Sequence, residues 1–257
     1  MTGSTESRLD GRRALITGGA RGQGANHAKA LAERGVSVMI ADIDAAGAGQ
    51  TADRLAESGL AVHATWLDVA DPSSWDACIG ACSERLGGLD ILVNNAGIFP
   101  SSSLMDCSLD EWNRVIAVNQ TGPFLGIQKT VPLLRQSRHG SIINILSVAA
   151  VLATEIAVAY AVSKAALLML TRSAAIALAP DIRVNAITPG IIDTDMMRQL
   201  DPERLKVRLA AYPMRRAGRV DEVSQAVIFL AGDASSFTTG AELRVDGGAL
   251  AGIRAQP

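Results

Sequence analysis

The 257 residues carry 24 lysines and arginines and 26 aspartates and glutamates, so the sequence lacks the basic excess of a nucleic-acid-binding protein. The length suits one α/β domain with a sizeable core. Three cysteines, Cys78, Cys82 and Cys107, are too few for a disulfide framework or a zinc site, and the three histidines are scattered, so we expect no bound metal.

Neither the N-terminus nor the apolar runs indicate export or membrane insertion. Residues 1–10 are polar and lack the apolar core of a signal peptide, so we expect a polar tail. The most apolar stretch, 157–179, is interrupted by Ser163, Lys164 and Arg172, and we expect no membrane-spanning segment. We therefore predict a cytoplasmic protein with no nucleic-acid or membrane partner.

Strands and helices alternate from residue 11 onward with short connections. Strands are predicted at 13–17, 36–41, 61–67, 89–93, 141–146, 182–187 and 242–245. Helices are predicted at 25–34, 45–58, 71–86, 109–136, 160–179 and 221–231. Gly122 and Pro123 should bend or interrupt the fourth helix. The alternation predicts a single-domain, Rossmann-type, doubly wound parallel sheet with helices on both faces, over residues 11–257.

A glycine-rich turn follows the first strand. Gly18, Gly22 and Gly24 lie between that strand and a helix, whose free N–H groups and positive dipole end favour a pyrophosphate. Asp42 ends the second strand about 20 residues further on, where a carboxylate accepts from the adenosine ribose and repels a 2′-phosphate. Arg21 in the turn favours the opposite choice, but Asp42 holds the more decisive position. We therefore predict NAD, rather than NADP, as cofactor.

Tyr160 and Lys164 are one helical turn apart and share one face of a helix. A phenol ordinarily titrates at about pH 10, and a fixed ammonium nearby favours its phenolate. The pair can therefore serve as an acid/base at working pH. The spacing alone is more typical of a packed tyrosine beside a solvated lysine, so the other motifs decide between the two interpretations.

Together these motifs resemble the short-chain dehydrogenase/reductase family. Residues 17–24 match its T-G-x-x-x-G-x-G turn, and residues 94–97 match its N-N-A-G segment. Four residues match the family's catalytic tetrad in order and spacing: Asn119, Ser147, Tyr160 and Lys164. Leu146 is a departure, since a second serine is frequent there. The resemblance extends from residue 11 to residue 248.

The resemblance implies interconversion of a secondary alcohol and a ketone, with direct hydride transfer to or from NAD. Tyr160 would be the general acid/base, Lys164 would lower the tyrosine pKa and bind the nicotinamide ribose, and Ser147 would orient the substrate oxygen. Asn119 would hold a water of the proton relay through a kink in its helix. Asn95 is expected to tie adjacent strands together. The implied cofactor contacts are Gly18, Arg21, Gly22, Gln23, Gly24, Asp42, Asp68, Val69, Asn94, Ala96, Gly97, Tyr160, Lys164, Pro189, Gly190, Ile192 and Thr194.

Three segments should determine the substrate: 98–105, 148–159 and 195–212. The second is strongly apolar, so we predict an apolar alicyclic or steroid-like alcohol or ketone. No basic cluster for a carboxylate or phosphate handle is evident apart from Arg198, Arg215 and Arg216, which can be solvated.

Two other functions remain open. One is a 3-oxoacyl-thioester reductase of the same family, linked to NADPH. The other is a catalytically silent NAD-binding regulator, which would have no need of the acid/base pair. The resemblance also implies a homotetramer, in which the helices at 109–136 and 160–179 form one interface and the C-terminal helix and strand form another.

Overall fold

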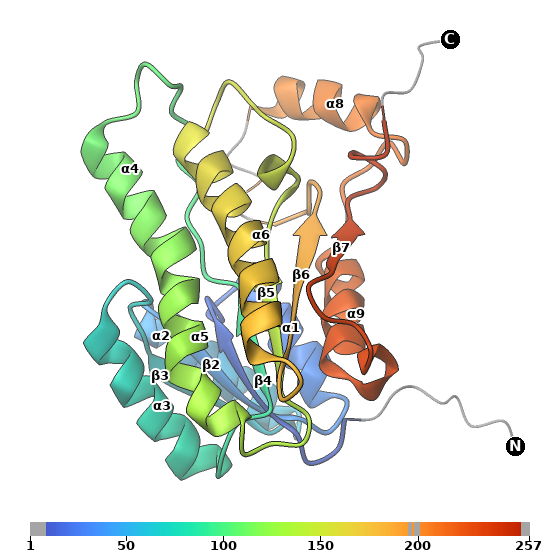
Figure 1. Cartoon of the computed structure of the whole chain (residues 1–257). Coiled ribbons are helices and arrows are strands. Elements are labelled where there is room, and N and C mark those ends of the chain that lie inside the picture. Colours follow the sequence, from blue (N-terminus) through green and yellow to red (C-terminus); the bar gives the residue numbers. More distant parts are fainter. Residues whose placement is uncertain (1–8, 195–196, 198–200, 253–257) are drawn as a thin grey trace, which may run out of the picture.

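The protein is built on one parallel sheet with the strand order β3-β2-β1-β4-β5-β6-β7 (Figure 1). The structure is a computed structural model that describes residues 9–194, 197 and 201–252. The strands are β1 (Arg13–Thr17), β2 (Ser37–Asp42), β3 (Val62–Trp66), β4 (Ile91–Asn94), β5 (Ser141–Ile145), β6 (Arg183–Pro189) and β7 (Glu242–Val245). The order reverses between β1 and β4, and ligands bind at the carboxyl ends of strands beside such a point. The predicted doubly wound sheet is confirmed.

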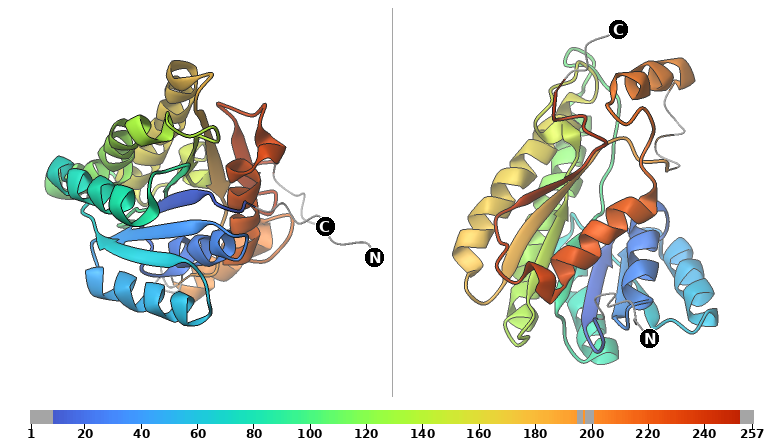
Figure 2. Two further views of the ribbon diagram at one scale, coloured as in Figure 1. Left: turned by 90° about the horizontal axis from the view of Figure 1, so that it is seen from below. Right: turned by 90° about the vertical axis from the view of Figure 1, so that its right-hand side faces the viewer.

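Helices cover both faces of the sheet (Figure 2). One face is covered by α1 (Gly22–Ala32), α2 (Ala45–Glu57) and α9 (Val220–Ala231). The other is covered by α3 (Pro72–Leu86), α5 (Gly122–Leu134) and α6 (Val158–Leu178). The other helical elements of the described residues are α4 (Leu109–Ile116), the π-helical η1 (Ala117–Thr121), α8 (Pro202–Ala211) and the short turns η2 (Val148–Ala150) and η3 (Asp233–Ser235).

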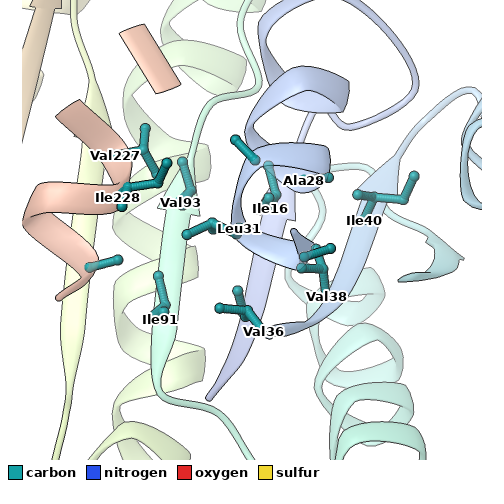
Figure 3. Close-up of a cluster of buried hydrophobic side chains, with 14 of the residues drawn as sticks. Ile16, Ala28, Leu31, Val36, Val38, Ile40, Ile91, Val93, Val227 and Ile228 are labelled. Atoms are coloured by element: carbon teal, nitrogen blue, oxygen red, sulfur yellow. The ribbon is translucent and has the colours of Figure 1, made fainter. Parts of the chain in front are cut away.

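Adjacent residues of a strand belong to two different cores, because successive side chains of a strand point to opposite faces. Ile16 packs with Leu31 of α1 and Val227 of α9 in the core drawn in Figure 3. Its neighbour Leu15 belongs to the core on the other face, together with Trp75 of α3. Burial on both faces explains why the central strands read as continuous apolar runs rather than alternating ones.

Local capping chemistry sets the starts of several helices. The Asp71 carboxylate accepts from the N–H groups of Ser73 and Ser74 at 3.0 and 3.2 Å, with Pro72 as the first residue of α3. These caps confirm the predicted start of that helix. In contrast, α1 begins at Gly22, earlier than the predicted residue 25, so the glycine turn itself forms the N-terminal turn of the helix. Other boundaries differ by a few residues, as is usual at frayed ends.

The predicted helix at 109–136 is helical through α4, η1 and α5, and a π-helical turn takes the place of a break. The N–H of Gly122 donates to the carbonyl of Ala117, which is the π-type spacing. Pro123 has no N–H to donate to the carbonyl of Asn119, its ordinary α-helical acceptor. The distortion therefore lies at Asn119, just before the Gly122–Pro123 pair that predicted it.

Helix α6 is long and apolar enough to cross a membrane by length and composition, with a mean hydropathy of 1.4 over its most apolar window. This finding corrects the expectation that no stretch reaches such a length. In the fold, however, α6 packs against β6 and η2, and it buries Lys164, Leu167 and Thr171. Its apolar composition reflects a helix that covers a sheet.

Candidate active site

A cavity of about 630 Å³ lies at the carboxyl ends of β1, β2, β3 and β4. Ligand pockets typically measure about 300–1,000 Å³, so it can hold an extended cofactor. The following predicted cofactor residues line it: Gly18, Arg21, Gly22, Gln23, Gly24, Asp42, Asp68, Val69, Ala96, Gly97 and Thr194. We call this space the nucleotide cavity.

The glycine turn brings backbone, rather than side chains, to the wall of the nucleotide cavity. A Cβ at Gly24 would lie 2.1 Å from the Gly18 carbonyl oxygen, so only glycine allows this close packing of turn and helix. Gly22 has a φ of +59° and open space beside it. The residue before α1, Arg21, makes no side-chain cap to the helix. The first N–H groups of α1 therefore remain available to an anion.

The Asp42 carboxylate is held in place at the end of β2. One oxygen accepts from the Ala20 N–H at 3.0 Å, and the other accepts from the Asp44 N–H at 3.0 Å. This fixed negative charge stands on the wall of the nucleotide cavity, as does the exposed Arg21. A ribose hydroxyl can donate to such a carboxylate, whereas a 2′-phosphate would be repelled by it.

A buried acceptor without a partner among the described residues lies where the nucleotide cavity meets a second cavity. The side-chain oxygen of Gln23 is fully shielded and accepts no hydrogen bond within the described structure. Gln23 lines both the nucleotide cavity and a second cavity beside it. A buried polar atom of this kind is costly unless a ligand satisfies it. The orphan acceptor, the glycine turn and Asp42 together fit a nicotinamide dinucleotide.

The second cavity has a volume of about 160 Å³ and contains the predicted catalytic hydroxyls. Ser147, which follows β5, and Tyr160 of α6 both line it, and we call it the substrate cavity. Four residues of the predicted nicotinamide side also line it: Pro189, Gly190, Ile192 and Thr194. Most of the remaining wall is apolar, from Phe99 and the segment around η2.

Tyr160 and Lys164 are joined by packing rather than by a direct hydrogen bond. The Lys164 ammonium lies 5.7 Å from the centre of the Tyr160 ring and donates to the Ile145 carbonyl at 2.8 Å. Phe99 packs edge-on against the tyrosine ring, with centroids 4.8 Å apart. The phenol is thus fixed between an aromatic neighbour and the end of β5.

Burial dominates the proton affinities of this pair. It lowers the pKa of Lys164 to about 8, because the charged ammonium is desolvated. It raises the pKa of Tyr160, while the interaction with the Ser147 side chain works in the opposite direction. The lysine was expected to lower the tyrosine pKa. In the structure Ser147 makes the favourable contribution, and burial outweighs it.

Asn119 is fixed by hydrogen bonds across the site. Its side-chain oxygen accepts from the Ile98 N–H at 2.9 Å, and its amide donates to the Ile98 carbonyl at 3.0 Å and to Ser163 Oγ at 3.2 Å. Gly97 packs against it, since a Cβ there would lie 3.3 Å from the Asn119 oxygen and 3.6 Å from Lys164 Nζ. The Asn119 side chain is therefore occupied by these hydrogen bonds.

Three predicted site residues line neither cavity, namely Asn94, Asn119 and Lys164, and Asn95 acts structurally. Asn94 is buried, and its amide donates to the Asn144 side chain at 2.8 Å, so it does not line either cavity. Asn95 donates to the carbonyls of Thr17 and Gly18 at 2.9 and 3.1 Å, which ties β4 to β1 as expected. Asp195 and Arg198, within a predicted substrate segment, lie outside the described residues.

Several wall residues were not singled out from the sequence. Ile43, Arg114, Ala117 and Val118 line the nucleotide cavity, and Arg208 lines the substrate cavity. Arg208 falls within the predicted substrate segment 195–212, and no motif marks it there. Within the described part of the chain, no three His, Cys, Asp or Glu side chains gather as a metal site.

The sequence and fold match known proteins along almost the whole chain. A family model described as Enoyl-(Acyl carrier protein) reductase matches residues 18–249. The chain belongs to the short-chain dehydrogenase/reductase family. Trans-4-hydroxycyclohexanecarboxylate dehydrogenase of Sinomonas cyclohexanicum is 42% identical over 249 residues, which cover 93% of each chain. The 3-alpha-(or 20-beta)-hydroxysteroid dehydrogenase of Mycobacterium bovis is 41% identical over 247 residues, covering 96% of this chain and 92% of the relative.

Solved structures share the fold of this chain along almost its whole length. One is described as a gluconate 5-dehydrogenase from Burkholderia cenocepacia in complex with NADP and tartrate. It superposes with a TM-score of 0.92 at 38% identity, covering 96% of this chain and 98% of that one. The chain is a short-chain alcohol dehydrogenase that uses a nicotinamide nucleotide. This finding argues against the alternative of a catalytically silent NAD-binding regulator.

Proposed function

We propose that this dehydrogenase uses NAD to oxidise a secondary hydroxyl group on a small carbocyclic ring to a ketone, and catalyses the reverse reduction. The substrate cavity carries the proposal, because its mainly apolar wall contains the hydroxyls of Tyr160 and Ser147. It adjoins the nucleotide cavity, since Gln23 and Thr194 line both. This arrangement suits an alcohol carbon placed beside a nicotinamide.

In the proposed reaction, Ser147 donates a hydrogen bond to the substrate oxygen, and Tyr160 Oη, deprotonated for this step, takes the hydroxyl proton. Bound NAD supplies the hydride acceptor. Lys164, with its pKa lowered to about 8, can exchange a proton near neutral pH while Ile145 holds its ammonium in place. The Asn119 carbonyl, without its ordinary helical donor, holds the water that passes the proton to solvent.

The size of the substrate cavity favours a single ring over a steroid. Its volume of about 160 Å³ lies below the range of about 300–1,000 Å³ that is typical of ligand pockets. Of the two relatives described above, one is named for a hydroxycyclohexane ring and the other for a hydroxysteroid. The cavity favours the smaller of these classes, and it gives the long arm of an acyl thioester little room.

NAD is proposed over NADP because of Asp42, whose fixed carboxylate faces the nucleotide cavity. The gluconate 5-dehydrogenase structure contains NADP, so fold alone does not decide the cofactor. Arg21, also on the wall, is exposed and lies in the glycine turn. Asp42 is the last residue of β2, which is the position where an acidic residue binds the ribose hydroxyl of such cofactors. Arg21 does not occupy that position.

We further propose a cytoplasmic homotetramer in which residues 11–257 form one catalytic domain behind the polar tail 1–10. Exposed apolar side chains along α4, α5 and α6 support the predicted helical interface: Leu109, Phe124, Val162, Met169 and Ile176. Free Cys78, Cys82 and Cys107 are compatible with a reducing compartment. Sedimentation of the purified protein tests the assembly.

An alcohol panel tests the function directly. Purified protein would be incubated with NAD or NADP and with single-ring secondary alcohols, a hydroxysteroid or simple sugars, and NADH or NADPH absorbance recorded. 3-Oxoacyl thioesters would be assayed in the reductive direction with each reduced cofactor. We expect the highest kcat/KM with NAD and the single-ring alcohols. Turnover restricted to thioesters or sugars would refute the proposal.

A further inference from the structure

The substrate cavity contains one charged side chain among the described residues that line it, which is Arg208. The other lining residues are apolar or glycine, apart from the hydroxyls of Ser147, Thr154, Tyr160 and Thr194 and the amide of Gln23. A charged residue on so apolar a wall is a feature that the oxidation of a simple ring alcohol does not require.

Arg208 lies on α8, which is located beyond the carboxyl ends of β6 and β7 (Figures 1 and 2). Its side chain is exposed, and within the described structure no carboxylate forms an ion pair with it. Tyr212, one helical turn further on, is the group whose pKa it affects, and it lowers that pKa against the larger effect of burial. The guanidinium is thus available to a ligand.

A wholly apolar ligand would bind unfavourably beside Arg208. A ring that fills the substrate cavity displaces water from the part of Arg208 that faces it, and desolvation of an unpaired charge is costly. A ligand with a negative group at that end would restore the lost hydrogen bonds with charge-assisted ones. The wall therefore suits a molecule with a hydroxyl toward Tyr160, an apolar ring in the middle and an anion toward α8.

We propose that Arg208 is a specificity-determining residue that binds a carboxylate on the substrate, so that the preferred substrates are hydroxylated ring carboxylates. This inference rests on the proposed oxidation of ring alcohols and names the substrate class within it. It also differs from the sequence prediction, in which no carboxylate handle was assigned to this part of the chain.

A carboxylate fits the site better than a phosphate or a cofactor phosphate does. The planar fork of a guanidinium matches a carboxylate with two parallel hydrogen bonds. A phosphate dianion carries more charge, and the described lining offers no second arginine or lysine to share it. Arg208 lines the substrate cavity and not the nucleotide cavity, which separates it from the pyrophosphate site at the N-terminus of α1.

The experiment compares one substrate with and without its charge. NAD-linked oxidation of 4-hydroxycyclohexanecarboxylate and of its methyl ester is measured for the wild-type enzyme, Arg208→Gln, Arg208→Lys and Lys206→Gln. Lys206 is the matched control, because it is a cation on the same helix that does not line the substrate cavity. NADH affinity is measured for each variant by fluorescence titration.

We expect the wild type to favour the carboxylate over the ester about tenfold in kcat/KM, which corresponds to one good charged contact. Arg208→Gln should abolish that preference by raising KM for the carboxylate, should leave the NADH affinity unchanged, and should reduce the salt dependence of carboxylate oxidation. Arg208→Lys should retain part of the preference, and Lys206→Gln should retain all of it.

Each contrary result has a distinct meaning. Equal kcat/KM for carboxylate and ester, or a preference that survives Arg208→Gln, overturns the role of Arg208 and leaves the ring-alcohol function standing. A weakened NADH affinity in Arg208→Gln also overturns it, because the arginine would then act on the cofactor. If the wild-type enzyme binds NADH but oxidises neither compound nor any other ring alcohol, the proposed function and this inference are both wrong.

Discussion

His27 should make the stability of this dehydrogenase depend strongly on pH, although it lies outside both cavities. It is completely buried in α1 and faces Ser224 of α9, with 2.7 Å between His27 Nδ1 and Ser224 Oγ. Ser224 Oγ also lies 3.1 Å from the Val220 carbonyl and accepts from the Asn26 side chain at 2.8 Å. The other ring nitrogen is buried and has no hydrogen-bond partner among the residues that the structure describes.

Protonation of His27 would place an unpaired charge in the core, and burial lowers its pKa from its ordinary value of 6.5 to about 3. Because the folded pKa is depressed, the unfolded chain binds more protons between these two values. The stabilisation is present above pH 6.5 and is lost as the pH falls toward 3. One proton corresponds to about 1.4 kcal/mol per pH unit, so about 2 kcal/mol should be lost between pH 7 and pH 5.

Urea unfolding at several pH values between 7 and 5 measures this loss. His27→Gln keeps a polar group beside Ser224 but does not titrate, so its free energy of unfolding should fall less with pH than that of the wild type. The difference between the two slopes should amount to about 2 kcal/mol over this range. Parallel curves for the two proteins would contradict a neutral buried His27. His63→Gln, on β3, serves as the comparison histidine variant.

Three further substitutions test the nucleotide cavity. Asp42→Asn removes the charge while keeping an oxygen for the Ala20 N–H, and should raise kcat/KM for NADP about tenfold; an unchanged cofactor preference would contradict the role of Asp42. Gln23→Leu removes the orphan acceptor and should weaken NADH binding about fivefold in calorimetry; unchanged affinity would contradict a role of that oxygen in cofactor binding. Gly24→Ala forces a Cβ against the Gly18 carbonyl and should cost about 2 kcal/mol of stability in urea unfolding; native stability would refute the packing.

The fold could be predicted from the sequence because parallel strands buried on both faces leave an unmistakable pattern. β1 and β7 begin and end at the predicted residues, and Asp71 and Ser108 cap helices that were predicted to start at residues 71 and 109. Sequence patterns predicted the position of a helix distortion better than its form, because the form depends on tertiary structure. The Gly122–Pro123 pair predicted a distortion, but its form as a π-helical turn at Asn119 depends on the whole helix.

The site could be predicted as far as its motifs reach. Ser147 and Tyr160 share one cavity as their spacing implied. The proton affinities could not be predicted, because the pKa values of Tyr160 and Lys164 are set by burial, which depends on packing from β5, η1 and Phe99. Arg208 carries no motif, and only the position of α8 above the sheet reveals that it faces the substrate cavity.

The most direct test of the proposed catalysis is Tyr160→Phe, compared with Tyr212→Phe. Tyr212 is the only other tyrosine in the sequence; it is also buried, and its pKa is likewise raised, yet it lines neither cavity. Tyr160→Phe removes the phenolic oxygen that takes the substrate proton. This loss should lower kcat for ring-alcohol oxidation by about a thousandfold, with NADH affinity unchanged. Tyr212→Phe should keep most of its activity. Wild-type turnover in Tyr160→Phe would contradict the assignment of Tyr160 as the acid/base.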